Sequence, residues 1–110
     1  MRGPLSHMPP QLKIDKDRLA EFCRRWKITE LALFGSVVRD DFGPDSDVDV
    51  MVTFAPQARH GLFAVVDMTD ELKEIFGRDV DLVTRPAIER STNWIRREAI
   101  LSSAETVYAA

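Results

Sequence analysis

Cysteine is nearly absent from this sequence, which holds only Cys23 among its 110 residues. An internal disulfide is therefore excluded. We expect a reducing, cytoplasmic setting, because the sequence also shows no charged-then-apolar leader that ends in a small-residue cleavage site. Long hydrophobic runs are missing too. Apolar stretches such as LALF (31–34) and LFAVV (62–66) are too short to span a bilayer, which excludes a membrane-spanning segment.

An excess of positive charge is also lacking. The chain has 15 basic and 18 acidic residues, a formal net charge of −3. Residues 1–8 (MRGPLSHM) read as a cloning or protease-site remnant, and without Arg2 the remaining 14 basic residues leave a net charge of −4. No global basic field is available to hold nucleic acid, so direct nucleic-acid binding is not expected. Residues 40–49 instead form a local acidic centre, with five acids and no base.

The chain is large enough for one domain and too small for two. With 45% apolar residues it can bury roughly two thirds of the surface that its unfolded form exposes, so one core needs neither disulfides nor a structural metal. No internal repeat or low-complexity tract is visible. We expect residues 9–110 to form a single domain.

Helical periodicity marks three segments. Residues 15–27 predict an amphipathic helix with Asp15 as its N-cap, and residues 61–76 predict a second helix with Gly77 at a left-handed C-cap. Pro86 opens a third helical region that reaches about Leu101. The apolar stripes expected on the first two helices are Leu19, Phe22, Cys23 and Trp26, and Leu62, Val65, Val66, Thr69, Leu72 and Phe76.

Short apolar or alternating segments predict strands at residues 30–34, 47–54 and 79–83, with a further extended segment at 106–109. In the second strand the alternation puts Asp47 and Asp49 on the face opposite Val48. In the third, Asp79 and Asp81 share a face. The order of elements indicates an α/β (α+β) domain with a mixed sheet of at least three strands flanked by helices.

One constellation carries chemistry. Gly35 and Ser36 end the first strand, ten residues follow, and Asp47 and Asp49 begin the next strand. Glycine allows phosphate oxygens to approach the backbone, and a hydroxyl beside a helix start suits an anion. Two carboxylates at i and i+2 on a strand project from one face and can share Mg²⁺ ions that bridge nucleotide phosphates.

Each half of this pattern has an ordinary structural reading. Gly-Ser before a helix is usually a turn with an N-cap, and Asp-x-Asp alone is more often a solvated loop than a metal site. Their fixed spacing, in a strand-turn-strand context, makes coincidence rare and favours the functional reading.

With these residues in place, the chain resembles the nucleotidyltransferase superfamily that shares a DNA-polymerase-β-like palm. The signature of that superfamily is Gly-Ser, ten residues, then Asp-x-Asp, and the match is complete. The segments LFGSVVRDDFGPDSDVDVMV and FGRDVDLVT look like those of the minimal, MNT-type nucleotidyltransferases, and the resemblance covers about residues 12–108. It implies a palm-type mixed sheet flanked by helices.

The resemblance also implies roles for individual residues. Gly35 and Ser36 match the phosphate-binding pair, Asp47 and Asp49 the metal ligands, and Arg39 an arginine of the intervening turn. A third carboxylate comes from the third strand, where Asp81 occupies the matching position. Asp79 is the competing candidate, since it shares that strand face and could instead cap the turn after Gly77. Asp40, where relatives often have glycine, and Val37, where they have an aromatic or basic residue, are departures that concern the loop path and nucleotide affinity.

The implied activity is transfer of AMP from ATP to a hydroxyl group with one or two Mg²⁺ ions. Asp81 would bind a second ion or accept the proton of the attacking hydroxyl. The implied acceptor is a partner protein, because MNT-type proteins typically pair with a small HEPN-domain toxin, which suggests a hetero-oligomer. The alternative is a binding module that neutralises such a toxin by contact. Transfer to a small molecule or an RNA end is disfavoured, since the chain lacks a basic stripe.

Other conspicuous residues predict structural roles. His60 has no Cys or His partner at metal spacing and reads as a loop residue. Cys23 falls on the apolar stripe of the first helix and should pack as a small hydrophobe. Trp94, Ile95 and Tyr108 fit either the core or a partner surface equally well.

Overall fold

The computed structural model describes residues 14–35, 46–61 and 63–110 of the chain. Its elements, in chain order, are α1 (Lys16–Arg25), β1 (Ile28–Phe34), β2 (Val48–Phe54), α2 (Ala64–Phe76), β3 (Val80–Thr84), α3 (Arg85–Glu89), α4 (Trp94–Ser103) and β4 (Glu105–Ala109). The strands form one sheet in the order β3-β2-β1-β4. β1 runs antiparallel to β2 and β4, whereas β2 and β3 are parallel. The expected mixed sheet is confirmed, and the extended tail supplies its fourth strand.

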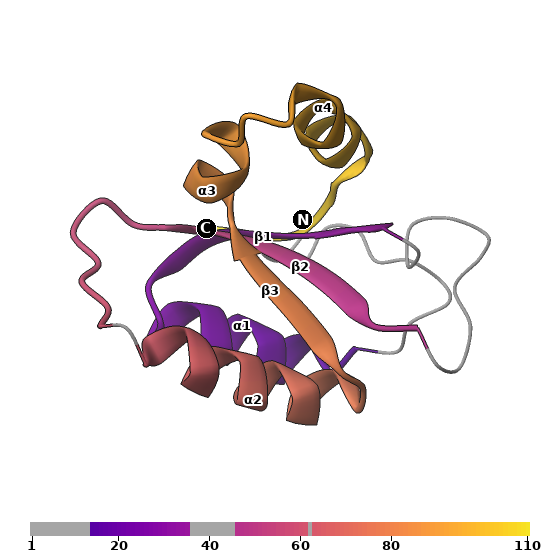
Figure 1. Ribbon diagram of the computed structural model, residues 1–110. Coiled ribbons are helices and arrows are strands. Elements are labelled where there is room, and N and C mark those ends of the chain that lie inside the picture. Colours follow the sequence, from indigo (N-terminus) through magenta and orange to yellow (C-terminus); the bar gives the residue numbers. More distant parts are fainter. Residues whose placement is uncertain (1–13, 36–45, 62) are drawn as a thin grey trace.

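Helices cover both faces of the sheet, with α1 and α2 on one side and α3 and α4 on the other (Figure 1). The larger apolar cluster lies between the sheet and α1 and α2, and includes Leu19, Phe22, Leu31, Val50 and Leu72. A smaller cluster lies on the α3 and α4 side, where Ala32, Phe34, Met51, Ile88 and Ile100 are buried. Alternate residues of β1 and β2 therefore enter opposite clusters, as a strand period of two requires. Among the described helices, none is long and apolar enough to cross a membrane.

The first helix forms as its sequence predicts. The Asp15 side chain accepts a hydrogen bond from the Arg18 backbone N–H at 3.1 Å, which confirms the N-cap. The acidic Asp17 lies in the first turn and the basic Arg24 and Arg25 in the last, where each charge complements the helix dipole. Helix α1 thus presents its apolar stripe to the sheet.

Cys23 lies on that stripe and is completely buried, which confirms that it packs as a small hydrophobe. Burial raises the pKa of its thiol to about 12, against a smaller opposing effect of Arg24. We therefore expect iodoacetamide to alkylate the native protein at pH 8 far more slowly than the urea-unfolded chain, measured by intact mass. Equal rates would contradict this burial.

The raised pKa of Cys23 also predicts how stability depends on pH. An unfolded thiol ionises at about pH 8.5, whereas the buried thiol stays protonated up to about pH 12. The free energy of unfolding should therefore decrease as the pH rises above about 8.5.

The second helix ends as predicted, but its buried stripe differs from the expected one. Gly77 adopts a left-handed conformation (φ 68°) and its N–H bonds the Lys73 carbonyl at 2.8 Å. The residues facing the sheet are Met68, Leu72 and Phe76. Val65 and Val66, which were expected on the stripe, are 41% and 57% exposed, and Leu62 lies outside the described residues. The residues at the start of α2 (63–66) are all apolar, so periodicity alone could not decide which of them faces the sheet.

The last helical region is two helices instead of one. Helix α3 ends at Glu89, and α4 begins after Asn93, whose side chain accepts from the Arg96 backbone N–H at 3.1 Å. This second N-cap starts a new helix axis. Of the residues left open between core and surface, Trp94 and Ile95 are 62% and 65% exposed, whereas Tyr108 is buried in the core.

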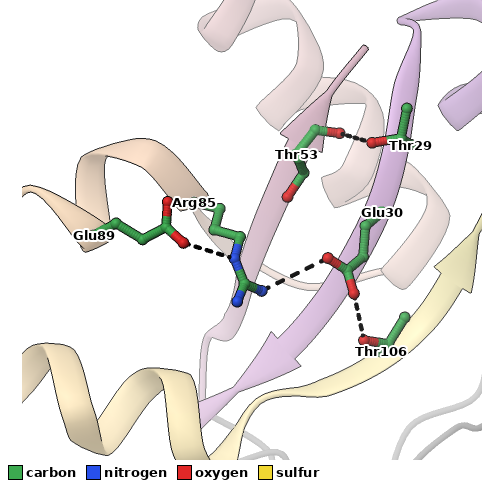
Figure 2. Close-up of polar contacts among 6 residues, drawn as sticks. All are labelled: Thr29, Glu30, Thr53, Arg85, Glu89 and Thr106. Carbon is green, nitrogen blue, oxygen red and sulfur yellow. Dashed lines mark hydrogen bonds and ion pairs between the residues drawn. The ribbon is translucent and has the colours of Figure 1, made fainter. Parts of the chain in front are cut away.

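A polar network fastens α3 to the sheet (Figure 2). Arg85, the first residue of α3, pairs with Glu30 of β1 at 3.6 Å and donates from Nε to Glu89 at 3.2 Å. Thr106 of β4 donates to the other oxygen of Glu30 at 2.9 Å. The network therefore joins β1, β4 and α3, and it lies toward the end of β1 away from Phe34.

Candidate active site

Two of the expected carboxylates come from neighbouring strands. In the parallel pairing of β2 with β3, Asp49 lies directly opposite Asp81, and adjacent strands are about 4.8 Å apart. Their neighbours Val48 and Val80 belong to the cluster beneath α1 and α2. By strand alternation, Asp49 and Asp81 therefore share the opposite face. Asp49 is half-buried and Asp81 is exposed, so this acidic pair meets solvent.

Gly35 brings the backbone at the end of β1 against the acidic pair. Phe34 pairs with Asp49 in the antiparallel ladder, and Gly35 follows with a φ of 75°. A Cβ atom at this position would lie 2.1 Å from Oδ2 of Asp49. Glycine is therefore required both for its left-handed backbone and for the close approach of a carboxylate.

Gly35→Ala is expected to lower the free energy of unfolding by about 2 kcal/mol, because the left-handed backbone of an L-residue costs roughly 1–2 kcal/mol and the Asp49 carboxylate must also move. Urea unfolding measures this change. Gly77→Ala provides the matched control, because Gly77 has a similar φ of 68° with nothing within 4 Å of a Cβ. Equal costs at the two positions would contradict the contact between Gly35 and Asp49.

Asp47 lies just before β2, between two residues that the α2–β3 turn holds. Its side chain is exposed. The Ser46 carbonyl accepts a hydrogen bond from Nη1 of Arg78 at 3.0 Å, and the Val48 N–H donates to the Asp79 carbonyl at 2.9 Å. Sequence reasoning did not single out Arg78. The only sequence signal for this contact was a basic residue directly before DVDLV (79–83), and a single arginine in a turn is usually a solvent-exposed surface residue.

Asp79 behaves differently from Asp81. Its side chain is 79% exposed and lies 4.0 Å from Nζ of Lys73 on α2, an ion pair within its own turn. It lies one position before β3, whereas Asp81 lies inside the strand opposite Asp49. The geometry therefore favours Asp81 over Asp79 as the third carboxylate, while its chemical role stays a prediction. Ser36 and Arg39, the other two expected site residues, lie outside the described residues.

The carboxylates suit a hard divalent cation by their chemistry. Mg²⁺ takes oxygen ligands, commonly one or two carboxylates together with water and substrate phosphates. In the described ranges, no group of three His, Cys, Asp or Glu side chains lies close enough to enclose an ion by itself. A pair from Asp49 and Asp81, with Asp47 at the start of the same strand, fits a cation that a nucleotide's phosphates help to hold.

His60 belongs to a different part of the fold. It lies in the loop after β2, as expected, and its Nε2 donates to the Trp26 carbonyl at 2.8 Å. Its ring packs against Trp26 and Phe54, with centroid distances of 5.5 Å and 4.8 Å. Through these contacts, His60 holds the loop after β2 against the C-terminal end of α1.

Comparison with known families gives one match that covers most of the chain. The model of the nucleotidyltransferase domain matches residues 16–106. Among curated relatives, MJ1215 of Methanocaldococcus jannaschii, named as a candidate protein adenylyltransferase, is 30% identical over 88 residues, which cover 80% of this chain and 100% of MJ1215. Protein adenylyltransferase MntA of Thermococcus cleftensis is 32% identical over 69 residues, covering 63% and 68% of the two chains. The match to M. jannaschii MJ1379, 33% identical, spans 64% of that protein and 58% of this chain.

Solved structures share the fold at lower identity. A toxin–antitoxin structure with AMP-PNP superposes with a TM-score of 0.66 at 18% identity, covering 88% of this chain and 75% of the other. A complex of a tri-AMPylated HEPN toxin with an MNT antitoxin from Shewanella oneidensis gives a TM-score of 0.57 at 20% identity, with coverages of 86% and 70%. These likenesses support the fold described above, including its mixed sheet with helices on both faces.

Proposed function

Because this chain belongs to the nucleotidyltransferase domain family, we propose that it transfers AMP from ATP to a hydroxyl group of a partner protein. The observation that carries the proposal is the in-register pair of Asp49 and Asp81, with the Gly35 backbone against it. Relatives with similar sequence are named protein adenylyltransferases, and a protein of the same fold has been solved in a complex with AMP-PNP.

The reaction needs negative charge to be neutralised. A bound Mg²⁺ ion would neutralise the triphosphate and the charge that develops on the leaving pyrophosphate. Asp47 and Asp49 would hold that ion, since two carboxylates at the start of one strand supply the oxygen ligands that Mg²⁺ prefers. Gly35 leaves room for Asp49 beside the strand end, and Ser36, which follows it in the sequence, would donate to phosphate oxygens.

In the transfer, the acceptor hydroxyl oxygen forms a bond to the α-phosphorus of ATP as the bond from that phosphorus to pyrophosphate breaks. The proton of the hydroxyl must leave. Asp81 can accept it, or can complete the cation's ligands so that water accepts the proton. Its exposed side chain, opposite Asp49 on the next strand, is reachable by an acceptor from outside the chain. Arg39 would contribute its guanidinium to a phosphate.

We propose a HEPN-type toxin as the acceptor, with this chain as its antitoxin in a hetero-oligomer. The support is a protein of the same fold, an MNT antitoxin, that was solved in complex with a tri-AMPylated HEPN toxin. The exposed side chains of Trp94 and Ile95 provide apolar area suited to a partner.

The test is to express the chain with the product of the adjacent gene and to measure the partner's intact mass. Transfer predicts one or more added AMP groups on the partner, produced again in vitro from purified proteins, ATP and Mg²⁺. Chelation of Mg²⁺ with EDTA should stop the transfer. A partner without any added AMP, in the presence of ATP and Mg²⁺, would refute this acceptor.

A further inference from the structure

The turn between α2 and β3 makes two hydrogen bonds to the start of β2, on either side of Asp47. Nη1 of Arg78 donates to the Ser46 carbonyl at 3.0 Å, and the Asp79 carbonyl accepts from the Val48 N–H at 2.9 Å. These two hydrogen bonds lie on either side of Asp47. The backbone that carries the first carboxylate of the Asp-x-Asp pair is thus held from the neighbouring strand.

The position of Arg78 depends on the glycine before it. Gly77 ends α2 in the left-handed conformation and reverses the chain direction, so that the next residue turns toward the start of β2. The side chain of Arg78 is half-buried. Its bond to Ser46 is also partly shielded from water, which makes a charge-assisted hydrogen bond stronger than an exposed one.

Charge gives this contact a purpose beyond folding. Asp49 and Asp81 lie opposite each other on β2 and β3, and Asp47 precedes Asp49 by two residues at the start of β2. Carboxylates that lie close together repel one another. That repulsion favours separation of the strand start from β3 until a cation binds. A guanidinium that holds the Ser46 carbonyl resists this separation and adds positive charge near the acidic group. Glutamine at this position would be neutral and two bonds shorter, so its amide would not reach the Ser46 carbonyl as Nη1 of Arg78 does and would not add the charge.

We propose that Arg78 is a positioning residue that holds Asp47 in the geometry required for cation and ATP binding. The part concerning ATP rests on the proposed function, whereas the part concerning the strand start does not. Replacement of residues that orient metal ligands without binding the metal themselves typically changes metal affinity by about 10- to 100-fold. Arg78 acts in the same way from the α2–β3 turn, whereas the carboxylate that it positions lies at the start of β2.

The first test measures the strand start without any nucleotide. In Arg78→Gln, hydrogen exchange at the Val48 amide should become about tenfold faster or more, while exchange at Leu33 in β1 stays unchanged. Lys73→Gln is the matched control, because it removes one positive charge from the last turn of α2, next to the α2–β3 turn, without touching Ser46. An unchanged rate at Val48 in Arg78→Gln would refute the proposed restraint.

The second test measures cation dependence. At fixed ATP, the Mg²⁺ concentration for half-maximal ATP binding should rise about tenfold or more in Arg78→Gln. Arg78→Lys should restore much of the affinity, because an ammonium can also donate one hydrogen bond to a carbonyl. A merely structural role would lower thermal stability but leave the Mg²⁺ dependence of the folded protein unchanged, and that outcome would refute positioning. Failure of the wild type to bind ATP would refute the proposed function instead, and exchange at Val48 would still test the restraint.

Discussion

Replacement of Asp47 and Asp49 together by asparagine is expected to reduce Mg²⁺-dependent ATP binding by about a hundredfold or more. Replacing even a group that only orients a metal ligand costs about 10- to 100-fold in affinity, and this variant removes the two carboxylates proposed as direct ligands. The fold should survive, because asparagine keeps the shape of each side chain and the repulsion between Asp49 and the opposite Asp81 is lost. Isothermal titration calorimetry with ATP, with and without Mg²⁺, measures the change.

The matched control removes the same charge elsewhere. Asp67 and Asp70 are exposed on α2, so Asp67→Asn with Asp70→Asn changes the net charge equally without touching β2 or β3. ATP binding should stay at the wild-type value in this control. Urea unfolding of both variants shows whether any loss of binding comes from loss of structure. Unchanged ATP and Mg²⁺ binding in the Asp47 and Asp49 variant would mean that the cation site lies elsewhere.

Local patterns in the sequence predicted the elements that carry the site. The alternation through residues 47–54 correctly separated Asp49 and Met51 from Val48, Val50 and Val52, because a strand that is buried on both faces still has a period of two. Gly35 was correctly expected to end β1, and the N-cap at Asp15 and the C-cap at Gly77 were also confirmed. Each of these signals depends only on residues that are close to one another along the chain.

Contacts between distant segments could not be predicted in the same way. The alignment of Asp49 with Asp81 depends on the register of two parallel strands joined through α2, and a shift by one residue would put Asp81 on the opposite face. The same limit explains Arg78, whose role appears only when the α2–β3 turn lies beside Ser46. It also explains α2, where the sheet selected Met68 instead of Val65.

Asp81→Asn is expected to separate catalysis from partner binding. The substitution keeps the size of the side chain, so binding to the proposed toxin partner should remain nearly unchanged. AMP transfer should fall by about 10²- to 10⁴-fold if the carboxylate accepts a proton, and loss of a cation ligand would also slow it strongly. Titration of the partner into each variant measures binding, and intact mass of the partner over time measures transfer.

Asp79→Asn is the control that distinguishes Asp81 from any acid of this segment. Asp79 is highly exposed, lies two residues earlier and pairs with Lys73, so its replacement removes one charge nearby but not the group opposite Asp49. Transfer in this variant should stay within about twofold of the wild type, because a substitution away from the reacting groups leaves transition-state contacts intact. Equal losses in both variants would indicate a general effect of charge instead of a specific role for Asp81.

The same pair of variants decides between transfer and neutralisation by contact. If AMP transfer silences the toxin, cells that express the toxin with Asp81→Asn should stop growing, although the two proteins still bind, and cells with Asp79→Asn should grow. A contact antitoxin predicts growth with both variants, because the binding surface is intact in each. It also predicts a partner without added AMP even beside the wild-type chain. Growth with Asp81→Asn together with an unmodified partner would therefore refute the enzymatic role toward this acceptor.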